Sequence, residues 1–178
     1  PGLMPVSIKP LALNIDSSDS WAKSNYIKAG FGNLSTPFAE AGFSFGDQQT
    51  KFNVFASHIS SNGKIEFQDY SQTAVKGHFF TPIATNHEFH GNLGFRQDKY
   101  YQFGYDKNLF NFSKSDLLKR YNTISAEVGL RNMAPTEFGL SYHPDLKIDI
   151  FSDNQKNNES NAVLDLPLIK SVGEALAL

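Results

Sequence analysis

The chain has 178 residues, a formal net charge of -2 and no cysteine; 40% of its residues are hydrophobic and 13% aromatic. This length fits a single domain, and the near-neutral charge excludes the basic footprint of a nucleic-acid-binding protein. The absence of cysteine excludes disulfides, a thiol nucleophile and cysteine-ligated metal clusters. No run approaches the roughly 20 apolar residues of a membrane-spanning helix.

The N-terminal residues 1–20 have a composition of their own, with prolines at positions 1, 5 and 10 followed by a polar stretch. Proline fixes φ and removes a backbone donor, so we expect an extended linker here. The remaining residues, 21–178, contain short runs that alternate apolar and polar side chains. The sequence therefore predicts an N-terminal segment, 1–20, and a region of β-strands, 21–178.

The alternation in this second region has a period of two. Ile27, Ala29 and Phe31 share one face of the first run, and Lys28 lies on the other. The same pattern recurs over 38–45, 51–57, 73–79, 89–96, 101–105, 123–131 and 137–142. Turn-like segments separate the runs at 33–37, 46–49, 81–86 and 132–135, and longer polar connections at 62–72, 106–116 and 152–161. The pattern predicts an all-β fold, an antiparallel meander of roughly 8–10 strands that forms a complete or partial barrel.

A sheet with one apolar face fits two environments. In a soluble barrel the apolar face points inward, whereas in a transmembrane barrel it faces lipid and the polar face lines the lumen. Small residues such as Ala29, Ala41 and Gly91 would leave gaps in a close-packed soluble core, which favours lipid. Aromatic residues also gather near the predicted strand ends, as in the girdles of outer-membrane barrels. They are Tyr26, Phe38, Phe45, Phe79, Phe80, Tyr100, Tyr101, Tyr105, Tyr121 and Tyr142.

Two motifs resemble a known family. The stretch NYIKAGFGNLSTPFAEA, residues 25–41, resembles the first hairpin of outer-membrane β-barrels of Bacteroidetes-type Gram-negative bacteria, often labelled TonB-dependent-receptor-like. The stretch HISSNGKI, residues 58–65, resembles the end of the third strand and the following loop. The resemblance implies a porin-like transmembrane barrel in the bacterial outer membrane. No plug domain or energy-coupling box is found, so active transport is not expected. The family barrel has more strands, and the chain ends ALAL without the terminal aromatic residue of an outer-membrane insertion signal, so we expect an N-terminal portion of a larger barrel.

Charged residues recur on the polar face of the predicted strands. In a barrel they would face the lumen, either as a pore lining or as a packing network that holds the strands in register. The candidates are Lys28, Glu40, Lys51, Lys76, Glu88, Arg96, Glu127, Arg131 and Glu137. The long polar connections carry aromatic residues that would either bind a glycan or protein or pack onto one another. These are Phe67, Tyr70, Phe110 and Phe112.

Candidate catalytic and metal-binding residues are few. His87 and His90 are three residues apart, so on a strand they face opposite sides and cannot ligate one ion. Ser141 and His143 share a face and suit a Ser–His pair, but no acidic residue is identified to orient the histidine. The sequence therefore predicts no catalytic residue, no metal and no cofactor.

These observations favour a non-catalytic outer-membrane β-barrel, which is transport-associated or structural. Its partners would be outer-membrane lipid and other envelope proteins, and not nucleic acid. Two alternatives stay open: a soluble β-barrel that binds a small apolar ligand, and an outer-membrane lipid hydrolase that uses Ser141 and His143.

Overall fold

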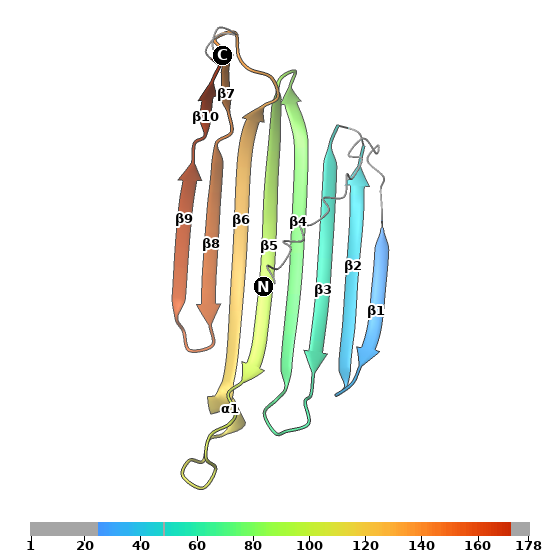
Figure 1. The fold of residues 1–178 in the computed structure, drawn as a ribbon, viewed down its shortest axis with the longest axis vertical. Coiled ribbons are helices and arrows are strands. Elements are labelled where there is room, and N and C mark those ends of the chain that lie inside the picture. Colours follow the sequence, from blue (N-terminus) through green and yellow to red (C-terminus); the bar gives the residue numbers. More distant parts are fainter. Residues whose placement is uncertain (1–24, 48, 172–178) are drawn as a thin grey trace, which may run out of the picture.

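The computed structural model describes residues 25–47 and 49–171. The described elements are β1 (Tyr26–Gly32), β2 (Thr36–Gly46), β3 (Lys51–Ser61), β4 (Tyr70–Ala84), β5 (His87–Tyr101), α1 (Lys114–Leu117), β6 (Leu118–Asn132), β7 (Leu140–Tyr142), β8 (Asp145–Asp153), β9 (Asn158–Asp165) and β10 (Leu168–Lys170). Eight strands form one antiparallel sheet in the order β1-β2-β3-β4-β5-β6-β8-β9, and β7 pairs with β10 (Figure 1). The predicted all-β meander is confirmed. The predicted linker, 1–20, lies outside the described residues.

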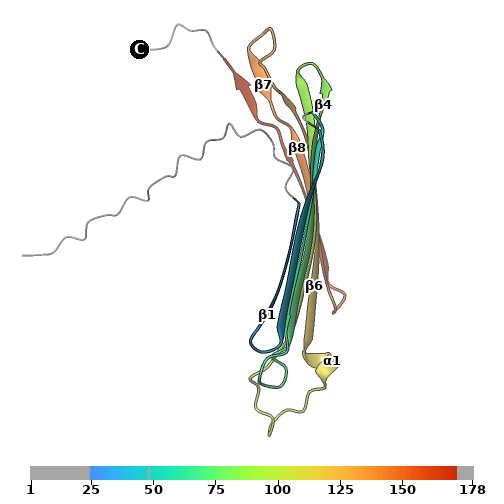
Figure 2. The same ribbon diagram turned by 90° about the vertical axis from the view of Figure 1, so that its right-hand side faces the viewer.

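The large sheet is a single, twisted layer. Seen along its edge, no other described element covers its broad faces (Figure 2). Within the described part of the chain, Leu117 is the one large apolar side chain that is buried. The two edge strands, β1 and β9, are not paired with each other, so the described sheet is open. Its closure into a barrel therefore stays a prediction.

Antiparallel pairing places the apolar residues of successive strands on one side of the sheet. Directly paired residues share a face, so a row of partners can be followed from strand to strand. One central row is Ala41, Ala56, Val75, Phe95, Ile124 and Ile150. We call the side of the sheet that carries this row the apolar face, and the opposite side the polar face. The adjacent row on the polar face is Gly42, Phe55, Lys76, Gly94, Ser125 and Asp149.

Three predicted boundaries are wrong. The predicted turn 81–86 is only partly a turn, because β4 continues to Ala84 and accommodates Pro82 at a register shift. The predicted strand 101–105 is a loop beyond Tyr101, and Gly104 adopts a positive φ of 89° there. The strand expected at 137–142 contains only β7, because Gly139, with φ of 69°, forms a turn with Thr136.

The aromatic residues expected in a girdle do not all share one face. The pairing places Tyr26, Phe38, Tyr100 and Tyr121 on the polar face, and the girdle itself stays a prediction. Aromatic side chains on the apolar face concentrate at the end of the sheet that carries the β2–β3 and β4–β5 turns. They include Phe45, Phe52, Phe79 and Phe89.

The single described helix, α1, lies in the long connection between β5 and β6. Ser113 caps it: its Oγ accepts a hydrogen bond from the Asp116 backbone N–H, and the Ser113 backbone N–H donates to the Asp116 carboxylate. Hydrogen bonds from the Ser113 side chain and backbone hold the pKa of Asp116 below its ordinary value. Among the described residues, no helix is long and apolar enough to cross a membrane.

Candidate functional site

The polar face carries eight of the nine charged residues predicted to face a lumen. Two pairs are direct cross-strand neighbours that form ion pairs. Lys28 Nζ lies 3.1 Å from Glu40 Oε1 across β1 and β2, and Arg131 Nη2 lies 2.8 Å from Glu88 Oε1 across β5 and β6. Such pairs tie neighbouring strands in one register, as the packing-network interpretation requires.

The other charged residues of this face have mixed surroundings. Arg96 forms an ion pair with Asp98 two residues along the same strand, at 2.7 Å. The Glu127 carboxylate accepts a hydrogen bond from Asn92, and Lys51 Nζ lies 4.9 Å from the centre of the Phe80 ring. Lys76 is exposed on β4. Glu137 lies in the connection before β7. The prediction for Glu137 is therefore wrong, because the alternating pattern there is a turn and not a strand.

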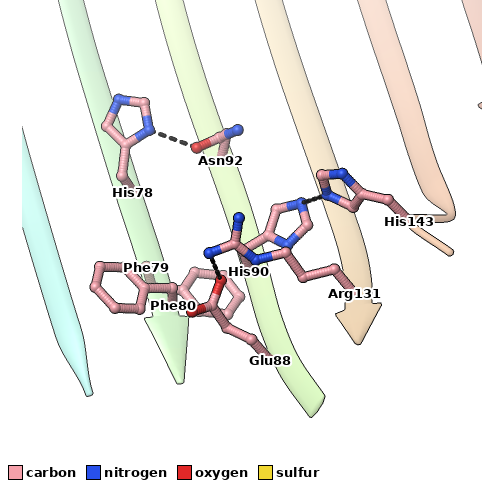
Figure 3. Close-up of a pocket in the computed structure, with 8 residues that line it drawn as sticks. All are labelled: His78, Phe79, Phe80, Glu88, His90, Asn92, Arg131 and His143. Atoms are coloured by element: carbon pink, nitrogen blue, oxygen red, sulfur yellow. Dashed lines mark hydrogen bonds and ion pairs between the residues drawn. The ribbon is translucent and has the colours of Figure 1, made fainter. Parts of the chain in front are cut away.

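A pocket of about 290 Å³ lies on the polar face near the ends of β4, β5 and β6. Figure 3 shows His78 on β4 turned toward Asn92, and His90 on the neighbouring β5 turned toward His143, which lies just before β8. The Glu88–Arg131 ion pair forms one side of the pocket. Charged and imidazole side chains from strands far apart in sequence therefore meet at this end of the sheet.

Three of the side chains here present ligand-type atoms to one another. His90 Nε2 lies 2.9 Å from Asp145 Oδ1, and His143 Nε2 lies 3.3 Å from His90 Nε2 and 3.6 Å from the same carboxylate oxygen. His90 comes from β5, Asp145 begins β8, and His143 lies just before β8. All three are partly exposed. This is the group of described residues best placed to hold a metal ion.

Neither His87 and His90 nor Ser141 and His143 form a joint site in the structure. His87 lies on the apolar face, where Nε2 is 2.6 Å from the Tyr142 hydroxyl oxygen, so it does not join His90. His143 directs Nε2 toward His90 and Asp145, and Ser141 lies on β7 opposite Ile169. The described geometry therefore contains no Ser141–His143 hydrogen bond of the kind that a nucleophilic pair uses.

The aromatic candidates in the long connections lie at the opposite end of the sheet. The connections 62–69 and 102–117 contact each other through two ion pairs, Lys107–Glu66 and Lys114–Asp69, the latter at 2.9 Å. The hydrogen bond to Glu66 raises the pKa of Lys107, and the one to Asp69 raises the pKa of Lys114. The two connections therefore form one surface beyond the strand ends.

The aromatic rings of this surface differ in exposure. Phe67 packs against Tyr101 with ring centres 6.4 Å apart. Phe110 and Phe112 stack on each other with centres 5.8 Å apart, yet both remain exposed, as does Tyr70. Packing onto neighbouring rings thus describes Phe67, Phe110 and Phe112. Because Phe110, Phe112 and Tyr70 also stay exposed, the binding interpretation stays a prediction.

The chain matches no protein-family model, no curated protein and no solved structure. The resemblance to outer-membrane barrels therefore stays an expectation from the two sequence motifs. The hairpin that carries the first motif is present as β1 and β2, and the second motif covers the end of β3 and the start of the connection that follows it.

Sequence reasoning missed Asp145 and the position of His143. His90 and His143 are 53 residues apart, and their meeting depends on the register of three strands. The one local signal was His143, two residues before Asp145. This spacing predicts no metal site unless the register that brings His90 beside them is known.

Proposed function

We propose that this chain forms part of the wall of a non-catalytic outer-membrane β-barrel, either transport-associated or structural. The apolar face would contact the lipid of the outer membrane, and the polar face would line the lumen. The observation that carries the proposal is an eight-stranded sheet whose described residues form no buried core and whose one side carries a continuous apolar band.

The lengths of the central strands support this environment. β2 and β3 have 11 residues each, and β4, β5 and β6 have 15 each. Strands of globular proteins usually have about 5–6 residues, whereas a tilted transmembrane strand needs about 9–11. Each of these five strands is long enough to cross a bilayer.

The exposed apolar area supports it as well. On the apolar face, Phe31 is 76% exposed, Ile27 75%, Leu93 60% and Ile124 50%. At ordinary sheet spacings, this face measures about 20 Å along the strands and about 34 Å across them, or about 700 Å². The largest apolar patch on a typical soluble monomer is about 300–600 Å². Burial of this face against lipid would supply the favourable free energy that a protein core supplies elsewhere.

The polar face fits a lumen better than a lipid or core environment. Its cross-strand ion pairs, Lys28–Glu40 and Arg131–Glu88, would be costly to place in hydrocarbon. In a soluble barrel the same face would point outward and the apolar face inward. The small residues of the apolar face, such as Ala41 and Ala56, favour lipid because acyl chains fill the space beside them.

Membrane fractionation of the full chain tests the proposal. We expect the protein to remain in the membrane pellet after an alkaline carbonate wash, to require detergent for extraction, and to migrate differently on a gel before and after boiling. A monodisperse monomer purified without detergent would overturn the proposal and favour the soluble barrel. Lipid hydrolysis that disappears in Ser141→Ala would favour the hydrolase.

A further inference from the structure

The cluster of His90, His143 and Asp145 lies at one end of the polar face and has no role in the barrel-wall proposal. We propose that these three side chains form a binding site for one divalent transition-metal ion, with zinc as the representative ion. The inference is independent of the membrane environment, since it rests on the geometry of three side chains and one glycine.

The separations of the ligand atoms fit one ion. Donor atoms bound at about 2.0–2.1 Å lie about 2.9 Å apart at a right angle and about 3.3 Å apart at a tetrahedral angle. The three separations in this cluster are 2.9 Å from His90 to Asp145, 3.3 Å between the histidines and 3.6 Å from His143 to Asp145. A central ion can therefore reach all three atoms after small side-chain movements.

The contacts among these atoms are within hydrogen-bonding distance, and the donor of each depends on which ring nitrogen carries the hydrogen. When Nε2 of both histidines carries a lone pair, two nitrogen lone pairs and a carboxylate oxygen lie within 3.6 Å of one another. A metal ion accepts all three at once.

The backbone provides a space for the cluster. His90 and Asp145 both pair with Gly129, which lies between them on the central strand β6. A Cβ atom at Gly129 would collide with the Asp145 carboxylate and with the His90 ring. Glycine at this position thus lets the two side chains approach each other over β6.

The surroundings permit a cation and suggest its class. Arg131, the nearby positive charge in the pocket, is paired with Glu88 at 2.8 Å, which reduces its repulsion of an ion. Two imidazoles and one carboxylate suit zinc and similar ions, whereas calcium and magnesium prefer oxygen ligands. The His143 side chain is 43% exposed, so a water molecule or an external ligand can reach the remaining coordination position.

Titration of the metal-stripped full chain with zinc chloride tests the site by isothermal calorimetry. We expect one zinc ion per chain, with affinity reduced about tenfold or more in His143→Ala and Asp145→Asn. The matched control is His78→Ala, which removes a histidine of the same pocket that is turned toward Asn92, and it should bind like the wild type. Gly129→Ala should weaken binding although all three ligands remain.

Absence of saturable binding would overturn the proposal, as would equal losses in His78→Ala and His143→Ala. Cobalt provides a second measurement on the unaltered chain, which keeps the test valid if a variant fails to fold. Bound Co²⁺ should give visible absorption bands of mixed nitrogen and oxygen ligation, and zinc should displace them. A spectrum that matches hydrated Co²⁺ would contradict the site.

Discussion

Replacement of Ile124 by arginine tests which face of the sheet contacts lipid. Ser125 is the middle residue of β6, and Ile124 precedes it on the apolar face with its side chain 50% exposed. On β6 the apolar band runs from Ile124 to Leu130, and the same face carries Asn122 beyond it, so Ile124 lies toward one edge of the band. Arginine on the lipid face costs about 2–4 kcal/mol at the bilayer midplane and about 0–1 kcal/mol near the interfaces, so the free energy of unfolding of Ile124→Arg should fall by about 1–2 kcal/mol.

Ser125→Arg is the matched control at the same depth. Ser125 pairs with Gly94 and Asp149 on the polar face, so an arginine there has space on one side and a carboxylate on the other. We expect its free energy of unfolding to change by less than about 1 kcal/mol. Urea titration of both variants in phospholipid vesicles measures the difference. Equal losses in the two variants, or no loss in Ile124→Arg, would refute the assignment of the faces.

Three further predictions concern local contacts. A Cβ at Gly91 would meet the Phe79 ring, so Gly91→Ala should lower the free energy of unfolding by about 1–3 kcal/mol, measured by the same titration. Lys114→Ala should speed hydrogen exchange in the two long connections without changing sheet stability, because its ion pair with Asp69 is exposed. The capping hydrogen bonds lower the pKa of Asp116 on folding, so they stabilise α1 above about pH 4. The protection factors of the α1 amides, corrected for the intrinsic exchange rate at each pH, should therefore fall as pH falls through that lowered pKa, but not in Asp116→Asn.

The strands could be predicted because one face is apolar along most of their length. In β5 the alternation of Phe89, Gly91, Leu93 and Phe95 already assigns each side chain to the face that the structure gives it. A period of two is a property of the backbone, so it is visible without knowledge of the partners. Short turns between successive runs are also visible in the local sequence. They predicted the antiparallel pairing of these runs correctly.

The ends of strands could not be predicted in the same way. Alternation continues through Phe103 and Tyr105, but the chain leaves the sheet after Tyr101, because the residues before β6 form the helix α1 and not a pairing strand. Pro82 indicated a turn, yet a register shift lets β4 continue past it. Both outcomes depend on neighbouring strands and not on the local pattern.

The meeting of His90, His143 and Asp145 was beyond sequence reasoning for a related physical reason. His90 and Asp145 meet because each pairs with Gly129, and one residue of slip in either pairing would move one of them to the other face. The ion pair of Lys28 with Glu40 was easier, because a short hairpin limits the register of β1 and β2. Sites across short hairpins are therefore predictable in part, and sites across several strands are not.

Whether the apolar face contacts lipid can be measured directly, because the chain has no cysteine and a single introduced cysteine carries a unique label. Ile124→Cys and Ser125→Cys would each carry the same small fluorophore in vesicles whose lipids are brominated on the acyl chains. The barrel-wall account predicts strong quenching of the label at position 124 and little at position 125. Absence of quenching at both positions, or stronger quenching at position 125, would contradict it.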